Sequence, residues 1–180
     1  MTQLTDFQLW LYRGVFVLAG LVAILLPLLP SGLTADAISM PDLFLCLVIA
    51  WVIRSPDTAP FFLVFAMALL ADVMLNRPIG LWAFLTLAGA EYMRATARTM
   101  REHMFLVETL IFGAALVAMS LAHLLVLNLA LVTTPRIGLV ASHLGVTILA
   151  YPVIVAILHW IIGIRAPRLP SASTRLGPIR

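Results

Sequence analysis

One acidic residue, Asp72, interrupts an apolar run that ends in a compact Asn-Arg-Pro-Ile-Gly turn at residues 76–80, and a second apolar run follows. A carboxylate within hydrocarbon is costly unless it finds water or a partner, so an acid in a membrane segment is a functional candidate by default. Pro78 fixes φ and lacks an N–H, and Gly80 accepts conformations that other residues resist, which predicts a tight helical hairpin. We expect Asp72 to bond backbone near the turn, or to pair with Arg77 or with a basic group of a partner.

Other polar side chains fall within or near apolar stretches: Glu108, His123, Asn128, His143 and His159. An intramembrane enzyme needs a nucleophile with its base, paired carboxylates or a metal triad. The sequence contains no Gly-x-Ser-x-Gly, no His-Glu-x-x-His and no adjacent acidic pair. We therefore predict a protein without catalytic, metal-binding or cofactor-binding residues. A cavity lined by His123, His143 and Asp72 that binds a small molecule remains an alternative.

Three arginines, Arg94, Arg98 and Arg101, follow one another at spacings i, i+4 and i+7. This spacing places them on one helix face if the helix that precedes them continues. The face either anchors the chain to lipid head groups or docks an acidic cytoplasmic partner. Glu91 stands three residues before Arg94 and can neutralise it locally.

The composition indicates a membrane protein. Hydrophobic residues make up 63% of the 180 residues, charged residues make up 11%, and the mean hydropathy is +1.10. Such a chain has too little polar surface to coat a soluble globule. A lone cysteine, Cys46, excludes an internal disulfide framework, and we expect it to be a small buried hydrophobe.

A helix needs about 20 mostly apolar residues to cross a bilayer. Six candidates are present, which predicts an all-α, six-span bundle over residues 1–164: Arg13–Pro30, Ala35–Ile53, Ala59–Leu75, Ile79–Met93, Met104–Val132 and Leu139–Ile164. The second span is interrupted by Pro41-Asp42 and could instead be re-entrant. Its acid should lie in the first helical turn, where the helix dipole favours negative charge.

Small residues recur at helix-packing spacing in Ala19-x-x-x-Ala23 and at Ala114, Ala118 and Ala122. In lipid, such residues let helices approach closely. We expect packing within the chain, with a partner helix as the alternative.

Every basic residue is an arginine, and their distribution predicts the topology. With both termini in the cytoplasm, nine of the 11 arginines lie inside, and Arg77 and Arg136 lie outside. Cytoplasmic loops collect positive charge, so this asymmetry favours an even number of spans. The basic tail at residues 165–180 is expected to be disordered or to lie on the lipid surface. The pI of 9.8 then reflects contact with anionic lipids and requires no nucleic acid.

The hairpin and its context resemble the MreD family, the rod-shape-determining membrane proteins of bacteria. The matching pieces are Pro41-Asp42-Leu43, Ala71-Asp72-Val73, Pro78-Ile79-Gly80-Leu81, and Tyr151-Pro152 with the trailing Arg165. Size, span number and cytoplasmic ends also agree. One departure is Asn76-Arg77, where the family tends to have small residues.

This resemblance implies a non-enzymatic subunit of the elongation machinery in the bacterial inner membrane. Its partners would be MreC, RodA, an elongation penicillin-binding protein and the MreB assembly, and its role would be to direct lateral peptidoglycan synthesis. The interface candidates are Asp72, Arg77, Pro78, Gly80, Arg94, Arg98 and Arg101. The family also resembles, in fold, the substrate-binding subunits of energy-coupling-factor transporters, so a small-molecule-binding transporter subunit is the alternative function.

Overall fold

The computed structural model describes residues 6–29, 40–100, 105–131 and 136–161, without the side chains of residues 98–100 and 161. This part of the chain contains six α-helices, which confirms the predicted all-α class: α1 (Asp6–Leu25), α2 (Leu43–Arg54), α3 (Phe61–Met74), α4 (Leu81–Met100), α5 (Phe105–Leu129) and α6 (Ile137–Ile161). Two short 3-10 helices, Leu26–Leu28 and Pro56–Thr58, extend α1 and separate α2 from α3.

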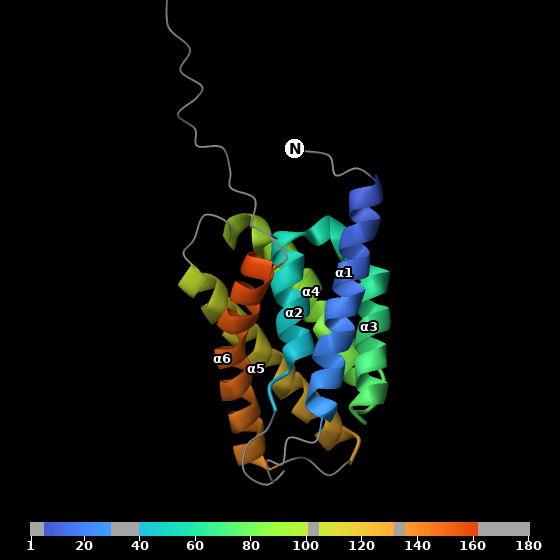
Figure 1. Ribbon diagram of the computed structural model, residues 1–180. Coiled ribbons are helices and arrows are strands. Elements are labelled where there is room, and N and C mark those ends of the chain that lie inside the picture. Colours follow the sequence, from blue (N-terminus) through green and yellow to red (C-terminus); the bar gives the residue numbers. More distant parts are fainter. Residues whose placement is uncertain (1–5, 30–39, 101–104, 132–135, 162–180) are drawn as a thin grey trace, which may run out of the picture.

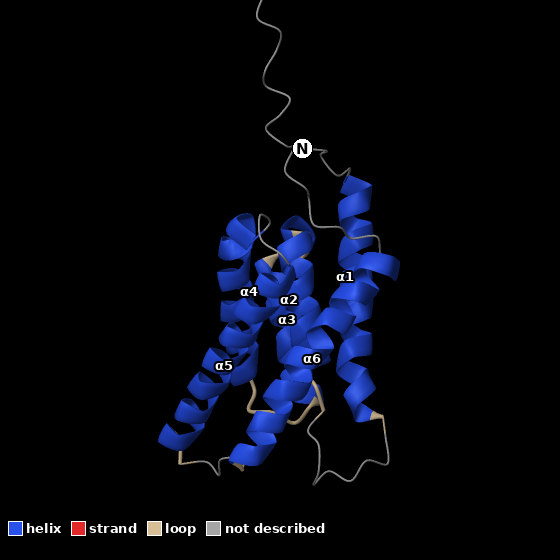
Figure 2. Ribbon diagram, turned by 90° about the vertical axis from the view of Figure 1, so that its left-hand side faces the viewer, coloured by secondary structure: helices blue, strands red, loops and turns tan. Residues whose placement is uncertain are grey.

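The helices form one bundle in which successive helices run in opposite directions (Figure 1). We call the end at which α1 begins and α6 ends the upper end, as it is drawn, and the end with the α3–α4 turn the lower end. Figures 1 and 2 both show α5 inclined to the other helices, crossing the bundle obliquely. The start of α1 and the end of α6 therefore lie at the same end of the bundle.

Three helical stretches of the described chain are long and apolar enough to cross a membrane: Asp6–Leu28, Phe105–Leu129 and Ile137–Trp160. The helices α2 and α3 are apolar but have only 12 and 14 residues. Helix α4 has 20 residues and includes Glu91, Arg94 and Arg98. Membrane insertion therefore rests on the first, fifth and sixth helices.

Helix α2 lies at the centre of the bundle, and all its residues from Phe44 to Arg54 are buried. It packs against α1, α4 and α6, which explains why its sequence is apolar on every face. It begins eight residues later than the predicted start at Ala35, because Asp42 caps it by accepting a 3.0 Å hydrogen bond from the Leu45 N–H. Asp42 is therefore the N-cap, one residue before the expected first turn.

Glycines permit two close helix contacts. A Cβ at Gly20 would lie 2.8 Å from Met67 Cε, where α1 meets α3, and one at Gly89 would lie 2.8 Å from Met119 Sδ, where α4 meets α5. The predicted alanine stripe of α5 behaves differently, since Ala114 and Ala118 are exposed. The expectation that this stripe packs within the chain is wrong for these two residues, because α5 turns its Gly113 side toward α6 instead.

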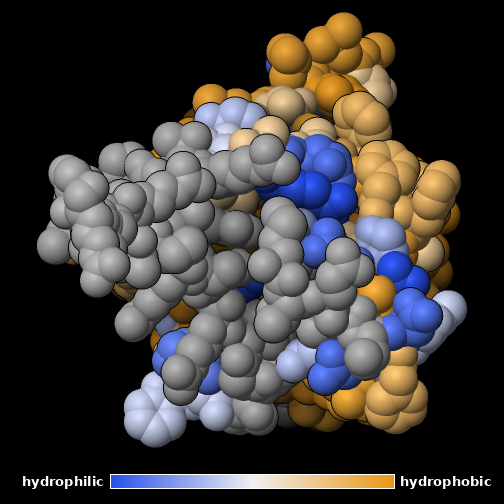
Figure 3. All heavy atoms as spheres, turned by 90° about the horizontal axis from the view of Figure 1, so that it is seen from above, coloured by the Kyte–Doolittle hydropathy of each residue, from blue (hydrophilic) through white to orange (hydrophobic). Residues whose placement is uncertain are grey.

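Polar and apolar side chains are separated at the upper end. Figure 3 shows hydrophilic side chains gathered on the described part of this end, with apolar side chains around its margin. Exposed apolar residues continue down the sides of the bundle on α1 and α5, including Trp10, Leu18, Leu110 and Leu121. This arrangement suits a bundle whose sides contact lipid or another apolar surface.

Candidate functional site

Helix α3 ends in a defined capping motif within the α3–α4 turn. The Arg77 N–H donates to the Asp72 carbonyl at 2.9 Å, and the Asn76 N–H donates to the Val73 carbonyl at 3.4 Å. Asn76 has a φ of 51°, in the left-handed region that asparagine tolerates. These features define a Schellman motif, with Asn76 in the position that glycine usually takes.

The Asp72 side chain caps the N-terminus of the next helix, α4. Its Oδ2 accepts hydrogen bonds from the Gly80 N–H at 2.9 Å and from the Ala83 N–H at 3.0 Å. Gly80 has a φ of 88°, so the turn needs a glycine there. Asp72 is 0% exposed. The predicted backbone cap is confirmed, while the alternative pair with Arg77 does not form, because the Arg77 side chain turns toward α2.

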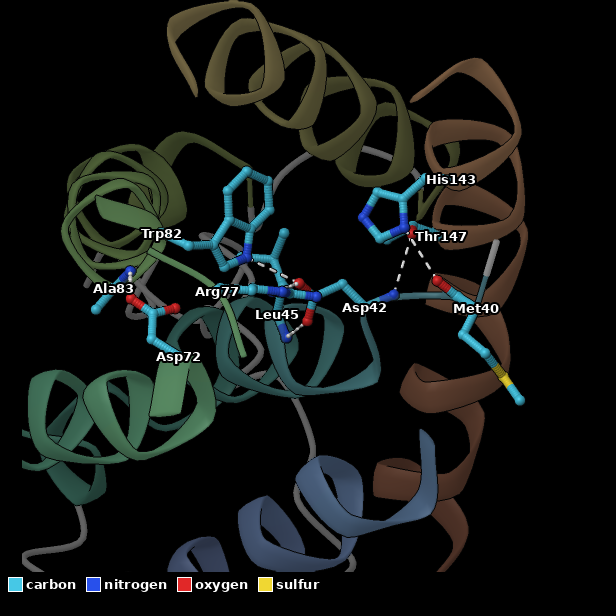
Figure 4. A network of polar contacts seen from close by, with 9 residues as sticks. All are labelled: Met40, Asp42, Leu45, Asp72, Arg77, Trp82, Ala83, His143 and Thr147. Atoms are coloured by element: carbon cyan, nitrogen blue, oxygen red, sulfur yellow. Dashed lines mark hydrogen bonds and ion pairs between the residues drawn. The ribbon is translucent and has the colours of Figure 1, made fainter. Parts of the chain in front are cut away.

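Asp42 is the centre of a polar network at the lower end (Figure 4). Its Oδ2 accepts from Arg77 Nη1 and from Trp82 Nε1, both at 2.8 Å, and its own N–H donates to Thr147 Oγ1 at 3.1 Å. Asp42 is 4% exposed. The network therefore joins the start of α2 to the α3–α4 turn, to α4 and to α6.

Aromatic contacts extend this network. The Arg77 guanidinium carbon lies 5.4 Å from the centroid of the Trp82 ring, within cation–π range. On the α5 side, the Trp82 and His123 rings meet edge to face, with centroids 5.2 Å apart. The Trp82 indole therefore connects the start of α4 both to the turn and to α5.

A partly open cavity of about 170 Å³ lies beside Asp42. It is lined by Ala23, Pro27, Met40, Pro41, Asp42, Leu43, Phe44, Leu75, Arg77 and His143. His143 Nδ1 is 3.0 Å from the Met40 carbonyl oxygen. The predicted cavity lined by His123, His143 and Asp72 is thus only partly right, because Asp42 and Arg77 accompany His143 in place of the other two.

A second polar cluster lies toward the upper end. Arg54 bonds both oxygens of Glu108, with Nη1–Oε1 at 2.9 Å and Nη2–Oε2 at 3.3 Å. The Tyr151 hydroxyl donates to the same Glu108 Oε1. Tyr151 also stacks on Phe112, with ring centroids 4.2 Å apart. The cluster joins α2, α5 and α6 and leaves Arg54 only 7% exposed.

The structure describes the side chain of only one of the three arginines of the predicted face, Arg94. Arg94 Nη2 donates to the Ala59 carbonyl at 2.6 Å, and Arg94 Nη1 lies 3.3 Å from Glu91 Oε1, which confirms the local neutralisation. Helix α4 continues past Arg98 as expected, but the Arg98 side chain and the whole of Arg101 lie outside the described residues. Arg94 therefore holds the α2–α3 connection to α4.

The predicted interface residues fall into two groups. Asp72, Arg77, Pro78 and Gly80 meet at the lower end, and Arg94 lies at the upper end. Sequence reasoning missed the roles of Trp82 and Thr147 at Asp42 and the cluster around Glu108. The sequence feature that could have predicted the Arg54–Glu108 pair is that these two residues carry opposite charges at the same end of two predicted spans.

The described residues contain no group of three or more His, Cys, Asp or Glu that could hold a metal ion. Most charged side chains in these residues bond another charged side chain or a backbone group of a neighbouring element, which is typical of contacts that hold helices together. Fold and site define an all-helical protein with three helices long and apolar enough for a membrane. Comparison with protein-family models, curated proteins and solved structures gave no match.

Proposed function

We propose that this chain is a non-enzymatic membrane subunit of the bacterial elongation machinery that binds MreC and helps direct lateral peptidoglycan synthesis. One observation carries the proposal. Most of the residues on which the MreD resemblance rests, Asp42, Asp72 and the turn 78–80, are joined by hydrogen bonds through the start of α4 at the lower end.

This lower end offers a fixed surface to a partner. Ile79, at the tip of the turn, is 75% exposed, while Asp72 and Asp42 hold the turn from behind. A preorganised surface binds with less loss of conformational freedom than a mobile one. The MreC membrane helix and its juxtamembrane region would meet the bundle here, with RodA, the penicillin-binding protein and the MreB assembly completing the complex.

The arginines support the orientation that this role requires. Among the described arginines, four lie in the halves of their helices nearer the upper end, Arg13, Arg54, Arg94 and Arg98, and two, Arg77 and Arg136, lie at the lower end. By the positive-inside rule, we infer that the upper end, where α1 begins and α6 ends, faces the cytoplasm. The short helices α2 and α3 then complete a six-span bundle in the bacterial inner membrane, shielded from lipid in part by their longer neighbours.

The rival function is a small-molecule-binding subunit of an energy-coupling-factor type transporter. The cavity beside Asp42 favours it, because polar groups from three elements converge there. Pockets that bind drug-sized ligands, however, have volumes of about 300–1,000 Å³. The cavity of about 170 Å³ is smaller than that range, which favours the scaffold.

A detergent pull-down of the tagged chain from its native membrane, with mass spectrometry of the co-purifying proteins, tests the proposal. Recovery of MreC with RodA or a penicillin-binding protein supports the scaffold. Recovery of an ATPase and a coupling subunit overturns it. Asp72→Ala removes the acceptor for the Gly80 and Ala83 N–H groups and should weaken MreC recovery while the chain still inserts, whereas Asp72→Asn keeps an oxygen acceptor and should weaken it less. Unchanged recovery with Asp72→Ala would show that MreC does not depend on the shape of this turn.

A further inference from the structure

The cavity beside Asp42 has the size and lining of a binding site for one ring or short chain. Apolar side chains from three elements line most of it: Ala23 and Pro27 from the end of α1, Leu43 and Phe44 from α2, and Leu75 after α3. Its volume of about 170 Å³ is close to that of the engineered apolar cavity of about 150 Å³ that holds benzene. A ligand with one six-membered ring fits this space.

Arg77 supplies the polar contact. Among the described residues, the one hydrogen bond of its guanidinium runs from Nη1 to Asp42 Oδ2, and the side chain is 26% exposed. A guanidinium carries five N–H donors in a fixed fork. Donors of Arg77 therefore remain for a ligand at the cavity wall.

The Asp42 carboxylate offsets the charge of Arg77, so the affinity of this site for a second carboxylate rests on the guanidinium N–H donors that Asp42 leaves unused. Asp42 accepts further hydrogen bonds from the Leu45 N–H and from Trp82 Nε1, and it caps the positive end of the α2 dipole. Asp42 therefore does not depend on a second donor of Arg77. A carboxylate is the acceptor whose two oxygens match the guanidinium fork.

We propose that this cavity binds a small monocarboxylate, with its apolar body among Ala23, Phe44 and Leu75 and its carboxylate on Arg77. The chemistry is the same for a free molecule and for an acidic side chain of a partner. The inference rests on the cavity and Arg77, and it holds whether or not the chain belongs to the elongation machinery.

Fluorine NMR of para-fluorobenzoate, titrated with the full chain in lipid nanodiscs, tests the site. Empty nanodiscs and the neutral para-fluorobenzamide control for partition into lipid. We expect saturable broadening of the benzoate signal alone. Arg77→Gln should weaken binding on the order of tenfold, the loss of one charge-assisted hydrogen bond. Arg136→Gln, at the same end but outside the cavity, should leave binding unchanged.

A second variant tests the cavity without touching the charge. Ala23→Leu fills the space and should abolish saturable binding while circular dichroism shows a folded bundle. Broadening equal to that of empty nanodiscs, equal binding of the benzamide, or full binding by both folded variants would overturn the proposal. If Arg77→Gln fails to fold, Ala23→Leu alone decides.

Competition separates the two sources of the carboxylate. A soluble segment of the co-purifying partner that displaces para-fluorobenzoate assigns the cavity to a side chain of that partner. Binding that persists at saturating partner assigns it to a free small molecule. Since the pull-down and the titration are separate measurements, either can fail without the other.

Discussion

Arg77 and Asp42 are 35 residues apart in sequence, and a 2.8 Å contact between Nη1 and Oδ2 joins them. This bond fixes the α3–α4 turn against the start of α2. Breaking a buried pair by removing one partner is costly, because the other charge loses its compensation. The contact therefore makes the position of the α3–α4 turn against α2 depend on the Asp42 carboxylate.

Asp42→Ala should lower the free energy of unfolding by about 3 kcal/mol, because it removes the acceptor for two buried N–H donors and for Arg77. Trp82→Phe keeps the ring and removes one hydrogen bond, so about 1 kcal/mol is expected. Thermal unfolding in detergent, followed by circular dichroism, measures both. Equal effects would show that Asp42 acts only through Trp82.

Asp72→Ala should cost about 1–3 kcal/mol, because the half-buried Gly80 N–H and the buried Ala83 N–H lose their acceptor. Asp72→Asn retains an oxygen acceptor and should cost less. Hydrogen exchange at Gly80 and Ala83 gives the local measurement. Faster exchange in the alanine variant alone is the expected result, and exchange unchanged in both variants would contradict the cap.

Glu108→Ala should lower the free energy of unfolding by about 3–5 kcal/mol, since it leaves the buried Arg54 guanidinium without its counter-ion. Tyr151→Phe should cost about 1 kcal/mol. Glu91→Ala is the matched control, because the Glu91 side chain is 39% exposed and its pair with Arg94 should contribute less than about 1 kcal/mol. A Glu91 effect as large as that of Glu108 would refute the distinction.

Gly145→Ala should be neutral or should stabilise α6 by up to about 1 kcal/mol, because nothing lies within 4 Å of the added Cβ. Gly89→Ala should lose this gain, since its Cβ meets Met119 Sδ at 2.8 Å. Adding Met119→Ala should then relieve the conflict at Gly89. Melting temperatures of the three variants provide the comparison, and identical shifts for the two glycines would argue against close α4–α5 packing.

Changing Arg94, Arg98 and Arg101 together to Gln should alter partner recovery or orientation if these residues dock a cytoplasmic partner. Arg94→Gln alone should instead reduce stability, because Arg94 bonds the Ala59 carbonyl. The double change of Arg98 and Arg101 isolates the docking role in the same pull-down. Unchanged localisation and recovery would leave lipid anchoring as a sufficient explanation.

Local chemistry made the hairpin predictable. Asp72 caps the backbone of the same hairpin, and Pro78 and Gly80 set the conformation of its turn, so their roles follow from the local sequence. Partners across the bundle did not follow, as the Arg54–Glu108 and Asp42–Trp82 contacts show. Ala114 and Ala118 illustrate the cause, because apolar residues face both lipid and neighbouring helices, and periodicity cannot separate the two.

The burial of α2 from Phe44 to Arg54 has a consequence for biosynthesis. The helix is translated before α6, yet its Thr147 contact and part of its cover come from α6. Until α6 arrives, the polar start of α2 at Asp42 and one side of its apolar surface lack their final neighbours. The central helix therefore reaches its native surroundings only after α6 has been translated, and a ribosome-released chain that stops before α6 should be a substrate for membrane quality control.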